Sequence, residues 1–114
     1  MLSKSLASAT LKPLVLSMLT DGPKYGFQLV YRARQLYDGQ VPWSNSKLYP
    51  LLHRMEHDGW IESYWQKSSS GPDRKYYRIT PVGVGVLESV QKEWKMVNAM
   101  WGELWGPEVA WDKG

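Results

Sequence analysis

The sequence contains no cysteine, and this absence removes whole classes of protein from consideration. Without thiols the chain has neither a disulfide framework nor thiolate chemistry, which fits the reducing cytoplasm where we expect the protein to act. Long apolar runs are absent too: nothing approaches the ~18 consecutive apolar residues of a membrane span, so we expect no membrane association. Lys12 and Pro13 interrupt the apolar run near the N-terminus and no cleavage pattern follows, so we expect no secretion signal.

The residues that are present fit one small domain with two differently charged parts. The 114 residues can bury a single core, and a hydrophobic fraction of 43% excludes disorder. The chain also carries seven tryptophans, an unusually large number for its size. Residues 24–80 hold nine basic and five acidic side chains, whereas residues 81–114 hold three basic and five acidic ones. This division favours one face for phosphate groups and another for a different partner.

Residues 44–61 give the strongest functional signal. Four apolar residues at i, i+3, i+4 and i+7 predict an amphipathic helix, with Ser44 as its N-cap and Gly59 at its left-handed end. The apolar positions are Leu48, Leu51, Leu52 and Met55, and the opposite face carries Ser46, Lys47, Tyr49, Pro50 and His53. A helix held by a core, with small polar and basic groups near its N-terminus, suits the DNA major groove. The alternative is an ordinary surface helix.

The flanking segments predict a winged helix-turn-helix, an α+β fold that is mostly α. Two helices are expected before the central one, at residues 10–19 and 25–37, with Pro13 in the first turn of the first helix. Their expected inward residues are Leu11, Leu14, Val15, Met18 and Leu19, then Leu29, Val30, Ala33 and Leu36. After the central helix come strand-like runs at residues 60–67 and 74–80, joined by a turn-rich tip.

The hairpin formed by these strands is the predicted wing. Ser70 and Gly71 lie at its tip, and Arg74, Lys75 and Arg78 line its returning strand. Basic side chains in this position suit the sugar–phosphate backbone or the adjacent minor groove. A solvated charged hairpin is the alternative.

A fourth helix is expected over residues 81–105, with Thr80 as N-cap and Pro81 in its first position. Its apolar positions alternate at spacings of three and four, the heptad pattern of a coiled-coil seam: Leu87, Val90, Trp94, Val97, Trp101 and Leu104. The seam either packs on its own domain or pairs two copies into a homodimer, which we favour because a monomer would expose a large apolar patch. We therefore divide the chain into a DNA-binding domain (1–80), a dimerisation helix (81–105) and a flexible tail (106–114).

Four runs of the sequence, in this order, resemble motifs of the PadR-like bacterial transcriptional regulators. They are GPKYGF at 22–27, LYPLLHRME at 48–56, DGWI at 58–61 and RKYYRIT at 74–80. The resemblance covers roughly residues 10–105. It implies a winged-helix DNA-binding domain with a C-terminal dimerisation helix, usually in a homodimer that acts as a repressor on double-stranded promoter DNA.

The short chain with one C-terminal helix is similar to a small subfamily that includes multidrug-sensing repressors. In some of those, a tryptophan on the last helix stacks flat ligands at the dimer centre, and Trp94 occupies the matching position. The resemblance thus implies a small aromatic effector that relieves repression. The tryptophans at 101, 105 and 111 depart from the usual pattern and could instead fill the central cavity.

The candidate DNA-binding residues come from the second helix, the central helix and the wing. They are Tyr25, Gln28, Ser44, Asn45, Ser46, Lys47, Tyr49, Pro50, His53, Ser70, Gly71, Arg74 and Lys75. Asn45 could hydrogen-bond adenine and Lys47 guanine, or both could contact phosphate alone. Tyr25 either positions the DNA backbone or is a packed aromatic residue, and Arg54 is expected in a surface ion pair. Of Tyr76 and Tyr77, which alternate across the strand, at most one faces DNA.

Two other classes of function compete with this interpretation. The residues from His53 to His57 match the H-x-x-E-H pattern of some zinc proteases, but no third histidine exists and the acidic residues are scattered. We therefore expect no enzyme activity, metal or cofactor. A winged helix that binds a partner protein through its tryptophan-rich surface is the more serious alternative.

Overall fold

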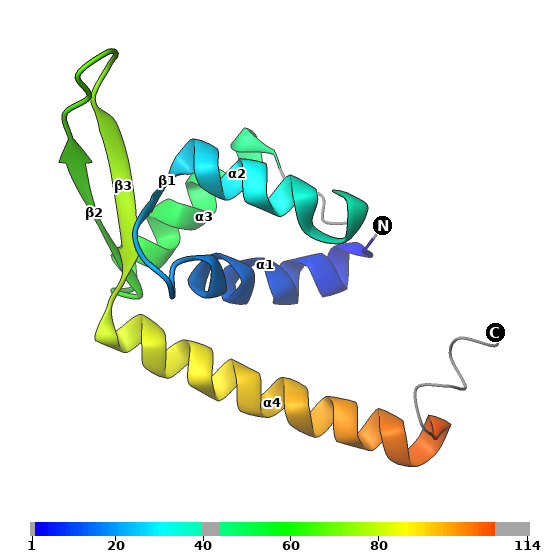
Figure 1. Ribbon diagram of the computed structural model, residues 1–114. Coiled ribbons are helices and arrows are strands. Elements are labelled where there is room, and N and C mark those ends of the chain that lie inside the picture. The colour runs from blue at the N-terminus through cyan, green and yellow to red at the C-terminus, as the bar shows by residue number, and fades with distance from the viewer. Residues whose placement is uncertain (1, 40–43, 107–114) are drawn as a thin grey trace.

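The computed structural model describes residues 2–39 and 44–106, and its fold is the winged helix-turn-helix expected from the sequence (Figure 1). Three helices form the body, a three-stranded antiparallel sheet projects from it, and a long helix follows. The elements are α1 (Lys4–Met18), β1 (Lys24–Tyr25), α2 (Gly26–Gln35), a short 3-10 helix (Leu36–Gly39), α3 (Asn45–His57), β2 (Ile61–Gln66), β3 (Arg74–Ile79) and α4 (Pro81–Trp105).

The core lies among the three body helices and the base of the sheet. Of the four apolar residues predicted for α3, Leu48, Leu52 and Met55 are fully buried, whereas Leu51 packs against the core while partly exposed. The remaining buried residues of the core cluster are Val15, Leu16, Leu19, Leu29, Val30, Ala33, Ile61, Tyr77 and Leu87. Since α3 is seated on this cluster along its whole length, its opposite face has a fixed orientation.

The first helix begins earlier than the sequence pattern predicted. Ser3 caps it, its hydroxyl accepting the N–H of Leu6 at 3.3 Å. Pro13 therefore lies inside α1 and not in its first turn. Because proline has no N–H, α1 lacks the hydrogen bond that residue 13 would donate to the carbonyl one turn earlier. Leu16, which the inward pattern omitted, is fully buried.

Two details around α2 also differ from the expectation. The helix ends at Gln35 and not at residue 37, and the chain leaves it through a 3-10 turn in which Asp38 and Gly39 have φ angles of 52° and 76°. Before α2, Lys24 and Tyr25 form a third strand that pairs with β3. This pairing fixes the start of α2 against the wing.

Local signals place the joints between α3, the wing and α4. Gly59 has the left-handed conformation predicted for the end of α3, with a φ of 79°. Its N–H donates to the carbonyl of Glu56 while that of Trp60 donates to Met55, which makes a Schellman ending. Thr80 begins α4 as expected, with its Oγ1 accepting the N–H of Gly83 at 3.1 Å.

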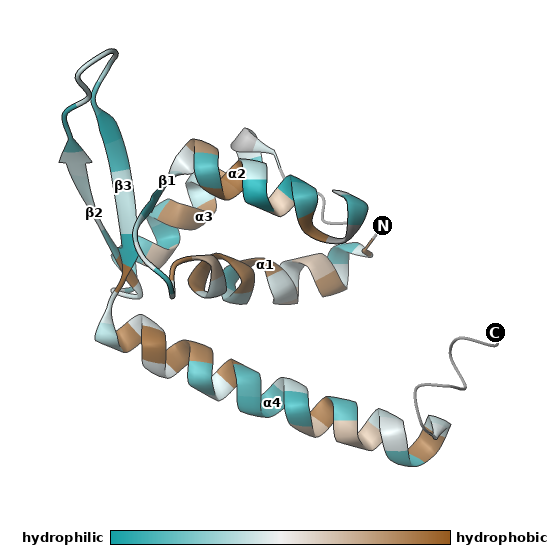
Figure 2. Ribbon diagram, in the orientation of Figure 1, coloured by the Kyte–Doolittle hydropathy of each residue, from teal (hydrophilic) through white to brown (hydrophobic). Residues whose placement is uncertain are grey.

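The last helix extends away from the body (Figure 1). The chain measures 53 × 28 × 23 Å with a radius of gyration of 16.4 Å, whereas a compact chain of similar length has roughly 13 Å. Only the first part of α4 contacts the core, through Leu87 and Val86, while apolar bands continue along its C-terminal half (Figure 2). Among the described residues no helix combines the length and apolar character needed to cross a bilayer.

Candidate nucleic-acid interface

The outer face of α3 is open to solvent. Ser46, Lys47, Pro50 and His53 are exposed, and Tyr49 is 40% exposed. Burial of the opposite face in the core holds these side chains outward. Pro50 has no N–H, so the carbonyl oxygen one turn before it lacks an intrahelical partner and remains free to accept a hydrogen bond.

The N-terminus of α3 adds hydrogen-bond donors to this face. Ser44 occupies the N-cap position as predicted, but its hydroxyl pairs with that of Ser46 at 3.0 Å and does not accept a first-turn N–H. Lys47 and Leu48 donate their N–H groups to the carbonyl of Ser44 at 3.1 and 2.9 Å, so the N–H groups that precede Lys47 are the ones suited to phosphate oxygen. Asn45 begins the helix, and its side chain lies outside the described part of the structure.

Tyr49 is positioned by a close approach between α3 and α2. A Cβ atom at Gly26 would lie 2.5 Å from the Tyr49 hydroxyl oxygen and 2.9 Å from a ring carbon. Only glycine therefore lets the tyrosine ring lie over the first residue of α2. This contact ties the two helices of the helix-turn-helix together directly beneath the exposed face.

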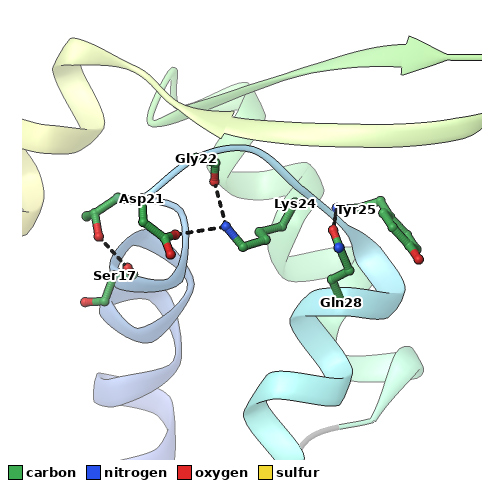
Figure 3. A network of polar contacts seen from close by, with 7 residues as sticks. Ser17, Asp21, Gly22, Lys24, Tyr25 and Gln28 are labelled. Atoms are coloured by element: carbon green, nitrogen blue, oxygen red, sulfur yellow. Dashed lines mark hydrogen bonds and ion pairs between the residues drawn. The ribbon is translucent and has the colours of Figure 1, made fainter.

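The loop before α2 is held by a short polar network (Figure 3). Lys24 Nζ donates to Asp21 Oδ1 at 2.9 Å and to the carbonyl of Gly22 at 3.1 Å, and this ammonium group lowers the pKa of Asp21. Gln28 Oε1 accepts the backbone N–H of Tyr25 at 3.0 Å. The side-chain oxygen of Gln28 thus caps α2, and its amide N–H groups remain the donors for the DNA contact predicted from the sequence.

The outer face of the sheet carries a row of rings and guanidinium groups. Tyr25 lies edge-on to Tyr76 with ring centroids 5.4 Å apart, and Tyr76 stacks on Tyr64 at 5.7 Å. Arg74 lies 4.7 Å from the Tyr25 ring and Arg78 lies 5.1 Å from that of Tyr64. Tyr25 thus packs against the wing, and its ring restricts the orientation of the Arg74 guanidinium.

Tyr76 and Tyr77 lie on opposite faces of the sheet, as the strand alternation predicted: Tyr76 is on the outer face and Tyr77 on the inner face. Tyr77 is 3% exposed and belongs to the core, and burial raises the pKa of its hydroxyl above the usual 10.0. Farther along the same face, Lys75 lies directly opposite Trp65 in the strand register, and the indole of Trp65 is 68% exposed. The tip residues Ser70 and Gly71 are exposed beyond them.

A groove of about 350 Å³ separates the wing from α3 and the start of α2. It is lined by Tyr25, Gly26, Phe27, Tyr49, His53, Trp65, Arg74, Lys75 and Tyr77. Five of the residues proposed from sequence for DNA binding meet here although they come from three elements. Trp65 and Phe27 were not among the candidates. The alternation of Ile61, Ser63 and Trp65 on one strand face was the available signal for Trp65.

The seam predicted on α4 divides into two parts. Leu87 is only 5% exposed and packs in the protomer's own core, so it is unavailable to a second copy. Val90 and Trp94 line a second groove of about 510 Å³ between α1 and α4. Beyond it Leu104 is 76% exposed, and the half-exposed indole of Trp101 stacks on Trp105 at 4.1 Å.

The competing zinc-site pattern has no geometric support in the described residues, which contain no cluster of three histidine or acidic side chains. His57 instead lies 3.5 Å from Asp58. Arg54 was expected in a surface ion pair, and this expectation is wrong for the described residues. Their lysine and arginine ion pairs join Lys24 to Asp21 and Arg78 to Glu62.

Comparison with known proteins identifies the class of this interface. The profile described as the transcriptional regulator PadR-like family matches residues 15–89. The chain belongs to this family. Its members are DNA-binding transcriptional regulators and not enzymes, so the exposed face of α3 belongs to a DNA-binding domain.

Solved structures of transcriptional regulators, two of them described as PadR proteins, are similar over nearly the whole chain. A PadR family regulator from Eggerthella lenta is 39% identical, with 88% of this chain and 85% of the other covered and a TM-score of 0.73. A PadR-like regulator from Bacillus cereus is 31% identical, with coverage of 92% and 100% and a TM-score of 0.79. A transcriptional regulator from Clostridium thermocellum is 26% identical, with coverage of 90% and 97% and a TM-score of 0.80.

Proposed function

We propose that this PadR-like protein is a sequence-specific repressor that binds a pseudo-palindromic promoter site as a homodimer in the cytoplasm. The observation that carries the proposal is the open face of α3, where Ser46, Lys47 and Tyr49 project from a helix seated on the core. Side chains on a rigidly held helix can maintain the geometry that base recognition requires.

In this mechanism the two copies of α3 enter successive major grooves about one helical turn, ~10 bp, apart or a multiple of it. Asn45 and Lys47 are the candidates for contacts to adenine and guanine. The wing follows the backbone, with Arg74 and Lys75 neutralising phosphates and Ser70 near the minor groove. Phosphate contacts set the register of the protein on the duplex, and the α3 contacts select the sequence.

The dimer is proposed to form through α4, using the seam beyond Leu87. Its members are Val90, Trp94, Val97, Trp101 and Leu104, which the protomer's core leaves at least partly exposed. The groove of about 510 Å³ beside Trp94 is apolar and lies against this seam, so a flat aromatic effector bound there could change how two copies pair. Residues 1–80 and 81–105 thus divide the work between DNA binding and dimerisation.

Operator binding tests the proposal directly. Labelled DNA from upstream of the protein's own gene is titrated against an unrelated duplex, for the parent protein and for Lys47→Ala. We expect the parent protein to prefer one site and the variant to bind it roughly tenfold or more weakly, because a good base contact contributes about 1–3 kcal/mol. An unchanged affinity in Lys47→Ala would remove α3 as the reading helix.

The same titration separates the regulator from a winged helix that binds only a partner protein. The exposed tryptophans support that alternative. Equal affinity of the parent protein for the promoter site and the unrelated duplex at several salt concentrations would favour it, because electrostatic attraction alone does not distinguish sequences.

A further inference from the structure

The groove between the wing and α3 combines an apolar wall with positive charge. The aromatic rings of Phe27, Tyr49 and Trp65 line it together with the basic side chains of Arg74 and Lys75. None of its nine lining residues is acidic, although the chain contains eleven acidic residues. Its charge therefore complements a polyanion.

Trp65, like Phe27, is a large aromatic residue of this groove whose exposure the core does not explain. It shares a strand face with Ile61, which is fully buried, but it lies farther out on the wing and is 68% exposed. Its register partner Lys75 points to the same side. The exposed indole of Trp65 and the ammonium group of Lys75 together suit a ligand in which apolar and anionic groups alternate.

The backbone of duplex DNA has this alternation, since deoxyribose rings separate successive phosphates. We propose that the groove holds the sugar–phosphate backbone of one operator strand, with Trp65 packed on deoxyribose and Lys75, its register partner on the same face of the wing, bound to an adjacent phosphate. The proposal rests on the DNA-binding function proposed above and adds a residue to its interface. Tyr49 and His53 lie both on the open face of α3 and in the groove, so the strand read by α3 continues into it.

A contact to sugar predicts a pattern of binding that differs from a contact to a base or to phosphate. Trp65→Ala should lower affinity roughly tenfold, because about half of an indole would lose its apolar contact area. The loss should be equal for operator and unrelated duplex, since sugar carries no sequence information. The slope of log affinity against log salt should not change. Lys75→Ala, in contrast, should reduce the slope by about 1 as one phosphate contact disappears.

The experiment titrates the full-length parent protein, Trp65→Ala, Trp65→Phe, Lys75→Ala and Met96→Ala with both duplexes at several salt concentrations. Met96 is the control, an apolar residue of α4 with a similar exposed fraction, 63%, that lies outside both the groove and the α4 seam. We expect Met96→Ala to bind like the parent protein and Trp65→Phe to retain most of the affinity. Thermal melts followed by circular dichroism show that each variant is folded.

Each remaining outcome has a defined meaning. Parent-like binding by Trp65→Ala overturns the proposed sugar contact while leaving the DNA-binding function intact. A loss confined to the operator also overturns it, because Trp65 would then contact a base. A parent protein that does not discriminate between duplexes contradicts the sequence-specific function, but a uniform loss in Trp65→Ala would still support the groove. Absence of any DNA binding by the parent protein contradicts both.

Discussion

Two glycines, Gly26 and Gly83, occupy the tightest contacts between elements, and they differ in what a side chain would meet. A Cβ at Gly83 would lie 2.1 Å from the carbonyl oxygen of Trp60, which belongs to the backbone between α3 and β2. A Cβ at Gly26 would meet the far end of the Tyr49 side chain, which is partly exposed and can move. Gly83 is therefore needed for the close packing of α4 against the backbone at Trp60, whereas Gly26 is needed for the position of the Tyr49 side chain.

Replacing Gly83 by alanine should destabilise the protein by at least about 1–3 kcal/mol, because backbone must shift to relieve the overlap. Gly85 provides a matched control on the same helix, since a Cβ there meets nothing within 4 Å. Gly85→Ala should be neutral or stabilising by up to about 1 kcal/mol, the usual helix preference for alanine. Urea unfolding of both variants measures the difference. Equal stabilities would show that α4 does not depend on this close approach to Trp60.

Gly26→Ala should act on DNA binding more than on stability. The new methyl group displaces the Tyr49 ring from α2, and a shifted ring disturbs both the α3 face and the groove beside it. We expect operator affinity to fall about three- to tenfold, a change in binding free energy of about 1 kcal/mol. The loss of stability should be smaller than that in Gly83→Ala. Fluorescence anisotropy with labelled operator and urea unfolding provide the two measurements, and an unaltered affinity would contradict the role assigned to Tyr49.

At the scale of elements, the sequence predicted α3, the wing and the start of α4 well because their signals are local. The N-cap at Ser44, the left-handed Gly59 and the Thr80-Pro81 pair each mark a boundary through the conformation of one or two residues. The short strand β1 could not be found in this way. Two residues have no periodicity, and their pairing with β3 depends on a contact formed only in the folded chain.

The candidate interface was predictable to the same degree. The exposed positions of α3 follow from the periodicity of its buried side, so they needed no knowledge of the rest of the fold. The groove is lined by residues of five elements that meet only in the folded chain, and for that reason Trp65 and Phe27 were missed. The heptad spacing of α4 likewise identified an apolar seam without revealing that Leu87 is used by the protomer's own core.

The molecule as a whole separates its two proposed tasks in space. The wing projects from one side of the body, and α4 begins at the base of the wing, passes α1 and extends beyond the body on the opposite side (Figure 1). Residues of α4 beyond Leu87 add little to the stability of the protomer because most of them are exposed. In a monomer the exposed tryptophans of the α4 seam place apolar surface in water, which is unfavourable in free energy. Pairing with a second copy would bury this surface.

Disrupting this pairing should therefore reduce DNA affinity without unfolding the DNA-binding domain. We expect the parent protein to sediment at twice its chain mass of 13.2 kDa, and the double variant Trp101→Lys with Leu104→Lys to sediment as a monomer. Glu103→Lys is the matched control, since it adds the same side chain at the same end of α4 but outside the seam.

Loss of the dimer should lower operator affinity because the two half-sites of an operator are then no longer bound by one linked molecule. A dimer binds its second half-site at a high effective concentration, so the double variant should lose at least about tenfold more affinity for a full operator than for a single half-site. Equilibrium sedimentation and operator titration test both steps. A monomeric parent protein would contradict the role assigned to α4, and a monomeric variant with undiminished affinity for the full operator would show that each protomer binds DNA independently.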